Sequence, residues 1–425
     1  MIKPVQIKHI MKLNEKRIEQ RLSKLSEFTI PGSPWTRRAF TEPYARARDW
    51  LEHEMTIAGL TTRIDHGGNL IGTLSGTNHT LGSLASGSHI DTVVDGGRYD
   101  GILGVVAALE TAQSMKENNY QPHHNIEVID FLSEEPSDYG ISCIGSRAMS
   151  GNLSSDHLQY TNASGEKLHE AIRRAGGTPE KIQNACRSKN ELAGFVELHI
   201  EQGRVLESNT KKIGVVTNIV GIKRFEMIIT GRSDHSGTTP MNLRQDALVG
   251  ASKIIERVNI EAKEYQTTNG YLVATIGAIH VRPNAVNAVP GEVRLTLEVR
   301  SDKQDWLDHF PEQLITFATK ACETERLQIK SRQLSYMHLT DCADLVIQTI
   351  ARSANTLDLS SMTMPSGAGH DSVFMAQLCP TGMLFIPCLD GRSHCPEESI
   401  TMEDAINGTN VLAQSILSLD QRVEK

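Results

Sequence analysis

The alternation of apolar and polar positions divides the chain into helical and extended stretches. Apolar residues recur at helical spacing over residues 9–26 and again in ARARDWLEHEMTIAGL, a helix expected to end near Gly59. From residue 63 the pattern changes to short apolar runs bounded by Gly and Asn, followed by a helical run, ILGVVAALETAQSM, and an extended run, NIEVIDFL. Because strands alternate with helices, the sequence predicts an α/β domain with a mainly parallel sheet.

A different pattern occupies the middle of the chain. The extended runs GVVTNIVGIKRFEMIITGRS, LVATIGAIHV and VRLTLEVRS are interspersed with two helical runs, DALVGASKIIERVNIEAKEY and DHFPEQLITFATKACETERL. About four strands and two helices are enough for a self-contained α+β domain. The α/β pattern then returns with ADLVIQTIARSAN and MLFIP. The sequence therefore predicts a discontinuous α/β domain over residues 1–213 and 333–425, interrupted by an inserted α+β domain over residues 214–332.

Composition narrows the class of protein. A chain of 425 residues that is 39% hydrophobic can bury the cores of two domains. Its formal net charge is −8 and its basic residues are dispersed, so nucleic acid is not an expected partner. The charged N-terminal stretch has no apolar core, and no run of about 18 apolar residues occurs, so neither export nor membrane insertion is expected. The seven cysteines include no CxxC pair, which favours reduced thiols and a cytoplasmic location.

Histidines and carboxylates gather where loops leave the predicted strands, which is where sites form in open α/β sheets. They are His89, Asp100, Glu134, Glu135, His199 and His394. Each one alone is better explained as a solvated charge or a helix cap. Together they have the ligand chemistry of zinc or a similar divalent ion, and the two oxygens of one Asp can bridge two ions.

Two acidic positions near these residues have competing interpretations. In the pair Glu134–Glu135, one carboxylate can bind metal while the other moves a proton, or the pair can simply favour a helix N-terminus. Asp91 can orient the imidazole of His89, or it can form an Asx turn. The residues alone leave both questions open.

The motifs resemble those of the hydantoinase/carbamoylase amidase family, within the larger superfamily of di-metal aminoacylases and carboxypeptidases. The matching stretches include GSHIDTVVDGGRYDGILGVVAALE, FLSEE, ELHIEQGRVLE, DHSGTTPMNLRQDAL, RPNAVNAVPGEV, SGAGHDSVFMA and GRSHCPEE. They cover most of the chain in the expected order. The resemblance implies an exopeptidase-like catalytic α/β domain and a smaller inserted domain of ferredoxin-like fold that acts as a lid and dimerises.

The resemblance also assigns roles at the metal site. It implies that His89 and His199 bind different metals, that Asp100 bridges them, and that Glu135 and His394 complete the two sites. Glu134 becomes the general base that deprotonates water shared by the metals. Two divalent ions per subunit are implied, zinc or manganese, with cobalt and nickel also compatible with these ligands.

Further positions match family residues that recognise substrate. They are Gln202, His235, Asn287, Arg300, Gly367, Gly369 and His370. His235 is implied to reach the active site of a partner subunit and to bind the oxyanion, while Arg300 can grip a substrate carboxylate in bidentate fashion. Without the resemblance, Arg300 is a strand residue, His235 a turn residue and SGAGHD a tight loop before a helix.

The implied activity is hydrolysis of the linear C–N bond of an N-carbamoyl-L-amino acid or related ureido acid, by a homodimer. Hydrolysis of allantoate, or of an N-acyl amino acid or dipeptide, is the alternative. A binding protein without catalytic activity would be expected to lack a ligand or the base, yet all six positions are present. Pro136 departs from the Gly that follows the Glu pair in many family members, which leaves the substrate subgroup open.

Overall fold

The computed structural model describes residues 11–266 and 270–422, which form two compact units. The first unit comprises the described residues within 1–217, 341–364 and 369–425, and the second comprises those within 218–340 and 365–368. In the described part of the chain, no helix combines the length and the apolar character that crossing a membrane requires.

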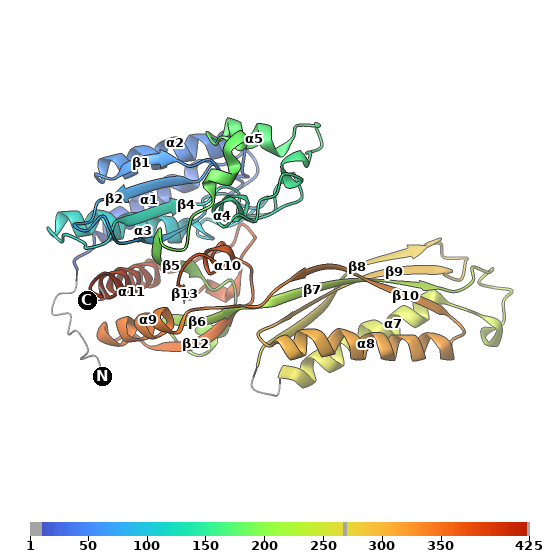
Figure 1. Ribbon diagram of the computed structural model, residues 1–425. Helices are drawn as coiled ribbons and strands as arrows, with labels where there is room; N and C mark the ends of the chain where they lie inside the picture. Colours follow the sequence, from blue (N-terminus) through green and yellow to red (C-terminus); the bar gives the residue numbers. More distant parts are fainter. Residues whose placement is uncertain (1–10, 267–269, 423–425) are drawn as a thin grey trace. The chain divides into compact units, whose positions relative to one another are not determined.

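The first unit is built on a nine-stranded sheet formed by the described residues (Figure 1). Its strands are β1 (Thr61–Ile64), β2 (Leu70–Leu74), β3 (Ser83–Ser88), β4 (Ile126–Asp130), β5 (Leu192–Ile200), β6 (Ile213–Ile219), β11 (Thr340–Asp341), β12 (Ser361–Ser366) and β13 (Thr381–Ile386). The central strands β4, β3, β5 and β13 are parallel, and antiparallel pairs lie toward the edges. The prediction of an α/β fold with a mainly parallel sheet is confirmed.

Helices cover both faces of this sheet (Figure 1). Successive strand residues point to opposite sides, so each strand packs side chains against the helices of both layers. Val196 packs in the larger core cluster, whereas its neighbour Phe195 packs in a smaller one with Met149 and Met375. The longer helices are α1 (Glu15–Glu27), α2 (Glu42–Ile57), α3 (Ile102–Glu117), α9 (Asp344–Thr356) and α11 (Met402–Asp420). The short ones are α4 (Ile144–Met149), α5 (Leu168–Arg174), α6 (Val205–Ser208) and α10 (Ser372–Met375), with 3₁₀ turns at His157–Gln159, Pro179–Ala185 and Leu389–Gly391.

The first helix begins later than its apolar spacing predicts. The side chain of Asn14 accepts a hydrogen bond from the backbone N–H of Arg17, so Asn14 is the N-cap and the helix starts at Glu15. Residues 9 and 10 of the predicted helix lie outside the described residues. The apolar pattern alone does not reveal this cap, because Met11 and Leu13, which are buried, continue the pattern on the N-terminal side of Asn14.

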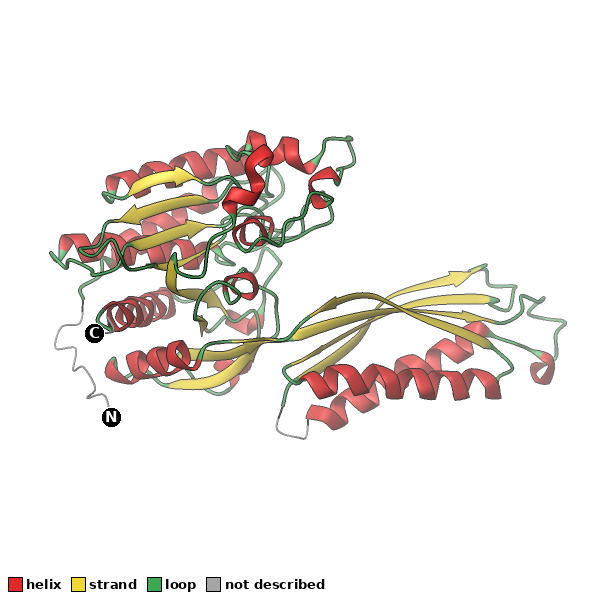
Figure 2. Ribbon diagram, viewed as in Figure 1, coloured by secondary structure: helices red, strands yellow, loops and turns green. Residues whose placement is uncertain are grey.

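The second unit is a four-stranded antiparallel sheet with two long helices on one face (Figure 2). Its strands, in sheet order, are β10 (Gln328–Met337), β7 (Gly221–Thr230), β9 (Glu292–Ser301) and β8 (Leu272–Arg282), and its helices are α7 (Ala247–Gln266) and α8 (Gln304–Thr324). A 3₁₀ turn spans Met241–Leu243. The edge strand β10 escapes the sequence patterns, because its residues are polar and mostly exposed. A separate α+β unit is confirmed.

A buried carboxylate ties the end of α11 to the loop before β4. Asp420 accepts hydrogen bonds from the Tyr120 hydroxyl at 2.7 Å and from the backbone N–H groups of His123 and His124 at 3.0 and 2.8 Å. Burial alone would raise the pKa of Asp420, but the hydrogen bonds from His124 and Tyr120 outweigh it and hold the pKa below its usual value. The ionised carboxylate is therefore the form that stabilises the fold.

We expect Asp420→Ala to lower the free energy of unfolding at pH 7 by about 2 to 3 kcal/mol, because it leaves buried donors without a charged acceptor. The folded pKa lies below the unfolded value of about 3.9, so the wild-type advantage is complete above that value and disappears as the pH falls through the folded pKa. Urea unfolding at several pH values measures both effects. Glu19→Ala, at an exposed position of α1, is the control. A difference between the two proteins that stays constant down to pH 2.5 would contradict this role.

Candidate metal-binding active site

Two buried histidines meet at the carboxyl ends of neighbouring parallel strands. His89 directly follows β3 and His199 lies near the end of β5, and the register pairs Ser86 with Val196. Continued along both strands, this register brings His89 beside His199, and their ring centroids are 6.0 Å apart. The topology of the sheet thus brings together two side chains that are more than a hundred residues apart in sequence.

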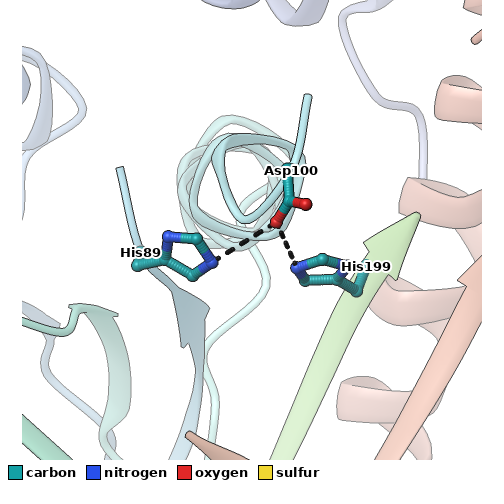
Figure 3. Close-up of side chains that lie close together, drawn as sticks. All are labelled: His89, Asp100 and His199. Atoms are coloured by element: carbon teal, nitrogen blue, oxygen red, sulfur yellow. Dashed lines mark ion pairs between the residues drawn. The ribbon is translucent and has the colours of Figure 1, made fainter. Parts of the chain in front are cut away.

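Asp100 completes this first group of ligands from the turn that precedes α3. Its Oδ1 lies 3.6 Å from Nε2 of His89 and 3.2 Å from Nε2 of His199 (Figure 3). Gly101 has a φ of +69°, and a Cβ there would lie 2.3 Å from Nε2 of His89, so only glycine fits behind Asp100. His89 and His199 face the same carboxylate oxygen, which favours one ion between them, whereas the resemblance implies that they bind different metals.

The other oxygen of Asp100 faces a second group. Nε2 of His394 lies 3.3 Å from Asp100 Oδ2 and 3.3 Å from Glu135 Oε1. The candidate ligand atoms of each group lie within 4.8 Å of one another, and the two groups share Asp100. The side chain of His394 is 48% exposed, whereas those of Asp100 and Glu135 are buried, so the second group lies closer to solvent than the first.

The hydrogen bonds at Nδ1 of the two histidines leave Nε2 of each ring facing the shared carboxylate. Nδ1 of His89 lies 3.0 Å from the carbonyl oxygen of Asp91, and Nδ1 of His199 lies 2.9 Å from that of Ile200. A carbonyl accepts only, so Nδ1 of each ring carries a proton, and Nε2 is the nitrogen available to a metal. Imidazole nitrogens beside a carboxylate form a donor set that zinc and similar divalent ions favour.

Asp91 links the His89 loop to the loop that carries the glutamate pair. Its two carboxylate oxygens accept the backbone N–H groups of Glu134 and Glu135 at 3.2 and 3.1 Å. Its carbonyl oxygen is the one nearest Nδ1 of His89, since the carboxylate Oδ1 is 3.5 Å away. The backbone of Asp91 therefore orients the imidazole, while its side chain positions the backbone of the glutamate pair.

The candidate base, Glu134, is buried between the first metal group and a thiol. Its Oε2 is 3.6 Å from Nε2 of His89, and its Oε1 accepts a hydrogen bond from Sγ of Cys143 at 3.6 Å. Burial raises the pKa of Glu134 well above its usual value, and the charges of Glu135 and Asp371 add to this, although His89 opposes it. A group with a raised pKa can both accept and return a proton near neutral pH.

Gln202 and His370, two of the predicted substrate residues, also lie at this centre. Nε2 of Gln202 donates to Asp100 Oδ2 at 2.6 Å, and Gln202 adopts a φ of +59°. The ring of His370 is buried, and its centroid lies 4.5 Å from that of His199. Burial lowers the pKa of His370 well below its usual value, and the neighbouring His199 lowers it further, so its imidazole is neutral.

The other predicted substrate residues, apart from Gly369 in the first unit, belong to the second unit. In β9, Arg300 donates from Nε to Glu298 at 2.7 Å and from Nη1 to the carbonyl oxygen of Gly367 at 2.8 Å. His235 and Asn287 lie side by side, since the N–H of Ser236 donates to the carbonyl of Asn287 at 3.0 Å. Both are exposed.

Arg300 and the pair His235–Asn287 lie toward opposite ends of the second sheet. His235 and Asn287 follow the ends of β7 and β8, which pair with Glu292 at the start of β9, and Arg300 lies near the other end of β9. The strand from Glu292 to Arg300 spans roughly 27 Å at about 3.4 Å per residue. Within one chain these side chains are too far apart to bind the same small molecule.

The sequence analysis missed carboxylates buried beside the ligands. Glu398 accepts the backbone N–H of Asp100 at 3.1 Å, and Glu197 accepts hydroxyl hydrogen bonds from Ser88 and Ser372 at 2.7 and 2.6 Å. Glu398 stands beside the exposed Glu397 in GRSHCPEE, and no spacing rule separates a buried acid from a solvated neighbour. Glu197 carried a weak signal, because it lies two residues before His199 and therefore on the same face of β5.

The chain is similar to known proteins over most of its length. Residues 85–418 match the model of peptidase family M20/M25/M40. The chain belongs to this family. It is 38% identical over 406 residues to an N-carbamoyl-L-amino acid amidohydrolase of Geobacillus stearothermophilus, covering 95% of this chain and 98% of the relative. It is 34% identical to an allantoate amidohydrolase of Escherichia coli, covering 95% of this chain and 97% of that protein.

A solved structure extends the likeness to the whole fold. The hydantoinase/carbamoylase family amidase of Burkholderia multivorans superposes with a TM-score of 0.89 at 31% identity, covering 96% of this chain and 98% of that one. The resemblance to hydantoinase/carbamoylase amidases is confirmed. Membership of the family, together with the ligand groups around Asp100, indicates that the site binds divalent metal.

Proposed function

We propose that the protein hydrolyses the C–N bond of an N-carbamoyl-L-amino acid or a related ureido acid. The observation that carries the proposal is the buried carboxylate of Glu134 beside two ligand groups that share Asp100. The relatives named above act on ureido compounds, by their names, and match this chain over nearly its whole length. The amino acid, ammonia and carbon dioxide would be the products from an N-carbamoyl substrate.

Two divalent ions, zinc or manganese, fit the proposal, one held by His89, Asp100 and His199 and one by Asp100, Glu135 and His394. Cobalt and nickel are also compatible with such ligands. When bound, these ions would polarise the carbonyl group under attack and lower the pKa of water. This fits a donor set of three imidazoles and two carboxylates.

The chain's own residues then move the proton. Glu134 takes a proton from the attacking water and returns it to the nitrogen of the leaving amine, for which its raised pKa suits it. The side-chain amide of Gln202 donates a hydrogen bond to Asp100, and its NH₂ group would also donate to a polar group of the substrate. The thiol of Cys143 donates to the second oxygen of Glu134 and restricts the rotation of its carboxylate.

Recognition of the substrate carboxylate is assigned to Arg300. Its guanidinium is held by Glu298 and by the carbonyl of Gly367, which leaves further N–H groups to donate. The Gly-rich segment from Gly367 to Gly369 allows close approach of the backbone, since a Cβ at Gly367 would lie 2.6 Å from the hydroxyl of Tyr271. A role of the inserted unit as a lid that contributes substrate contacts is part of the proposal.

A homodimer formed through the inserted unit is part of the proposal. The roughly 27 Å of strand between the Arg300 end and the His235 end of the second sheet exceeds the length of a small ureido acid. A second copy could supply His235 and Asn287 to the site that Arg300 serves, with His235 donating to the oxyanion. A cytoplasmic location, inferred from the cysteine pattern, also belongs to the proposal.

The test is ammonia release from a panel of N-carbamoyl-L-amino acids, allantoate and N-acetyl amino acids, with metal-stripped protein reloaded with manganese or zinc. Ammonia from the carbamoyl compounds supports the proposal. Ammonia from allantoate alone assigns the allantoate amidohydrolase activity, which the relative from Escherichia coli favours. Free amine from the acetyl compounds without ammonia assigns the aminoacylase activity, and no product from any compound refutes the proposal.

We expect Arg300→Lys to raise KM for the carbamoyl substrate by about 10- to 100-fold with a smaller change in kcat, because an ammonium cannot hold a carboxylate in bidentate fashion. Initial rates over a range of substrate concentrations separate the two constants. Arg332→Lys, on β10 of the same sheet where Arg332 pairs with Glu226 at 2.8 Å, is the matched control. An unchanged KM in Arg300→Lys would show that another group binds the carboxylate.

A further inference from the structure

Glu398 is a buried carboxylate that no ligand or catalytic role accounts for. Glu398 is only 1% exposed and lies at the end of the loop that carries His394. Oε1 accepts the backbone N–H groups of Tyr99 and Asp100 at 2.8 and 3.1 Å. Oε2 accepts the hydroxyl of Ser393 at 2.8 Å. Both oxygens are therefore used to hold backbone and side chains around metal ligands.

Ser393 extends this network to the shared ligand itself. Its Oγ lies 2.8 Å from Asp100 Oδ2 as well as from Glu398. A hydroxyl carries one proton, so Ser393 donates to one of the two carboxylates at a time. Glu398 thus holds the backbone N–H of Asp100, and Ser393 lies within hydrogen-bonding distance of both carboxylates.

Gly97, which has no side chain, leaves room for the carboxylate of Glu398. A Cβ at Gly97 would lie 1.9 Å from the Glu398 carboxyl group. Gly97 therefore lets the turn before Asp100 approach the carboxylate closely, and any larger residue there would displace it. The turn at residues 97–100 and the loop at residues 393–398 are distant in sequence and pack directly against each other around this carboxylate.

The two ligand groups depend on Glu398 to different degrees. His89 and His199 extend from β3 and β5, and carbonyl groups of Asp91 and Ile200 orient their rings. His394 has no strand to position it, has a φ of +54°, and is half-exposed in a loop. Only the second group combines a loop histidine with the Asp100 oxygen that Ser393 contacts.

We propose that Glu398 is a positioning residue that joins the Asp100 turn to the His394 loop and so sets the divalent-metal affinity of the group Asp100–Glu135–His394. The group His89–Asp100–His199 depends on it less. This inference rests on the two-ion site of the proposed function. Groups that orient metal ligands commonly contribute 10- to 100-fold to metal affinity.

The test is calorimetric titration of Mn²⁺ into metal-stripped protein, with the metal content measured after dialysis. In Glu398→Ala we expect one of two binding events to weaken by at least about tenfold and the other to change little. Glu398→Gln should recover most of that loss, because its amide oxygen still accepts two N–H groups and its NH₂ group faces Ser393. Glu397→Ala, which removes an exposed partner of Arg392, is the control and should bind as the wild type does.

Two results would overturn the inference: Glu398→Ala binds both ions like the wild type, or it loses both to the same extent while remaining folded by circular dichroism. If Glu398→Ala does not fold, Ser393→Ala decides, since it removes only the hydroxyl between Glu398 and Asp100; selective weakening of one ion supports the inference and unchanged binding refutes it. A wild-type protein that binds a single ion refutes the two-ion site instead. Because the readout is metal binding, it does not depend on which substrate is hydrolysed.

Discussion

Glu134→Gln is expected to lower kcat by about 10³-fold or more, at the upper part of the range for loss of a general base, while the protein keeps its metal. Glutamine has the same size and retains a carbonyl oxygen for the Cys143 thiol, but it cannot take the proton from water. The neighbouring ligand Glu135 is untouched, so the metal content after dialysis should match that of the wild type. Ammonia release under saturating substrate, beside metal analysis of the same sample, measures both.

The matched control is Glu191→Gln, which changes an exposed carboxylate immediately before β5, the strand that carries His199. It should retain wild-type kcat. Residual activity above one tenth of the wild type in Glu134→Gln would remove Glu134 as the base. Loss of metal in Glu134→Gln would instead make Glu134 a ligand, and the separate roles assigned to Glu134 and Glu135 would then be wrong.

The architecture was largely predictable from the sequence, because burial imposes a readable periodicity. The run NIEVIDFL, for example, has apolar residues on both faces, Val128 on one and Ile129 on the other, because β4 is buried inside the sheet. β10 was unpredictable for the opposite reason: as an edge strand it buries little and carries the polar run QIKSRQ. The start of α1 depended on a single capping side chain, Asn14, rather than on periodicity.

The candidate site was predictable as a set of residues but not as an arrangement. Predicted strand ends identified the histidines and carboxylates, and the motif resemblance supplied their separate roles. The contacts between the imidazole nitrogens and the oxygens of Asp100 depend on the register of β3 against β5 and on the turn at Gly101. Residue spacing predicts neither of these features. That is why residue spacing does not predict that both histidines face one oxygen of Asp100.

The supporting carboxylates could not be recognised for a related reason. A buried acid is stabilised by donors that come from distant segments: Glu398 by the amide groups of residues 99 and 100, and Glu197 by Ser88 and Ser372. Those donors are ordinary backbone and hydroxyl groups with no signature of their own. Only the fold brings them to the carboxylate.

Asp100→Asn tests the central feature of the site, because Asp100 is the one residue that both ligand groups contain. The asparagine side chain is uncharged and has one oxygen, whereas the aspartate carboxylate has two. Each ligand group therefore loses its shared carboxylate and is left with a neutral amide at position 100. We expect affinity for both ions to fall by more than the 10- to 100-fold that loss of a merely supporting group produces. Ammonia release should become undetectable at micromolar metal.

Thermal unfolding provides an independent measure of the same loss. An ion at 100 times its Kd stabilises the folded protein by about 2.7 kcal/mol, so adding Mn²⁺ should raise the Tm of the stripped wild type by several degrees. Asp100→Asn should show almost none of this increase. His394→Ala, which removes a ligand of one group only, should keep the part contributed by His89 and His199. Loss of a shared ligand should weaken both ions, whereas loss of an unshared ligand should weaken one. If Mn²⁺ raises the Tm of Asp100→Asn and of His394→Ala by the same reduced amount, Asp100 binds one ion and the bridging arrangement is refuted.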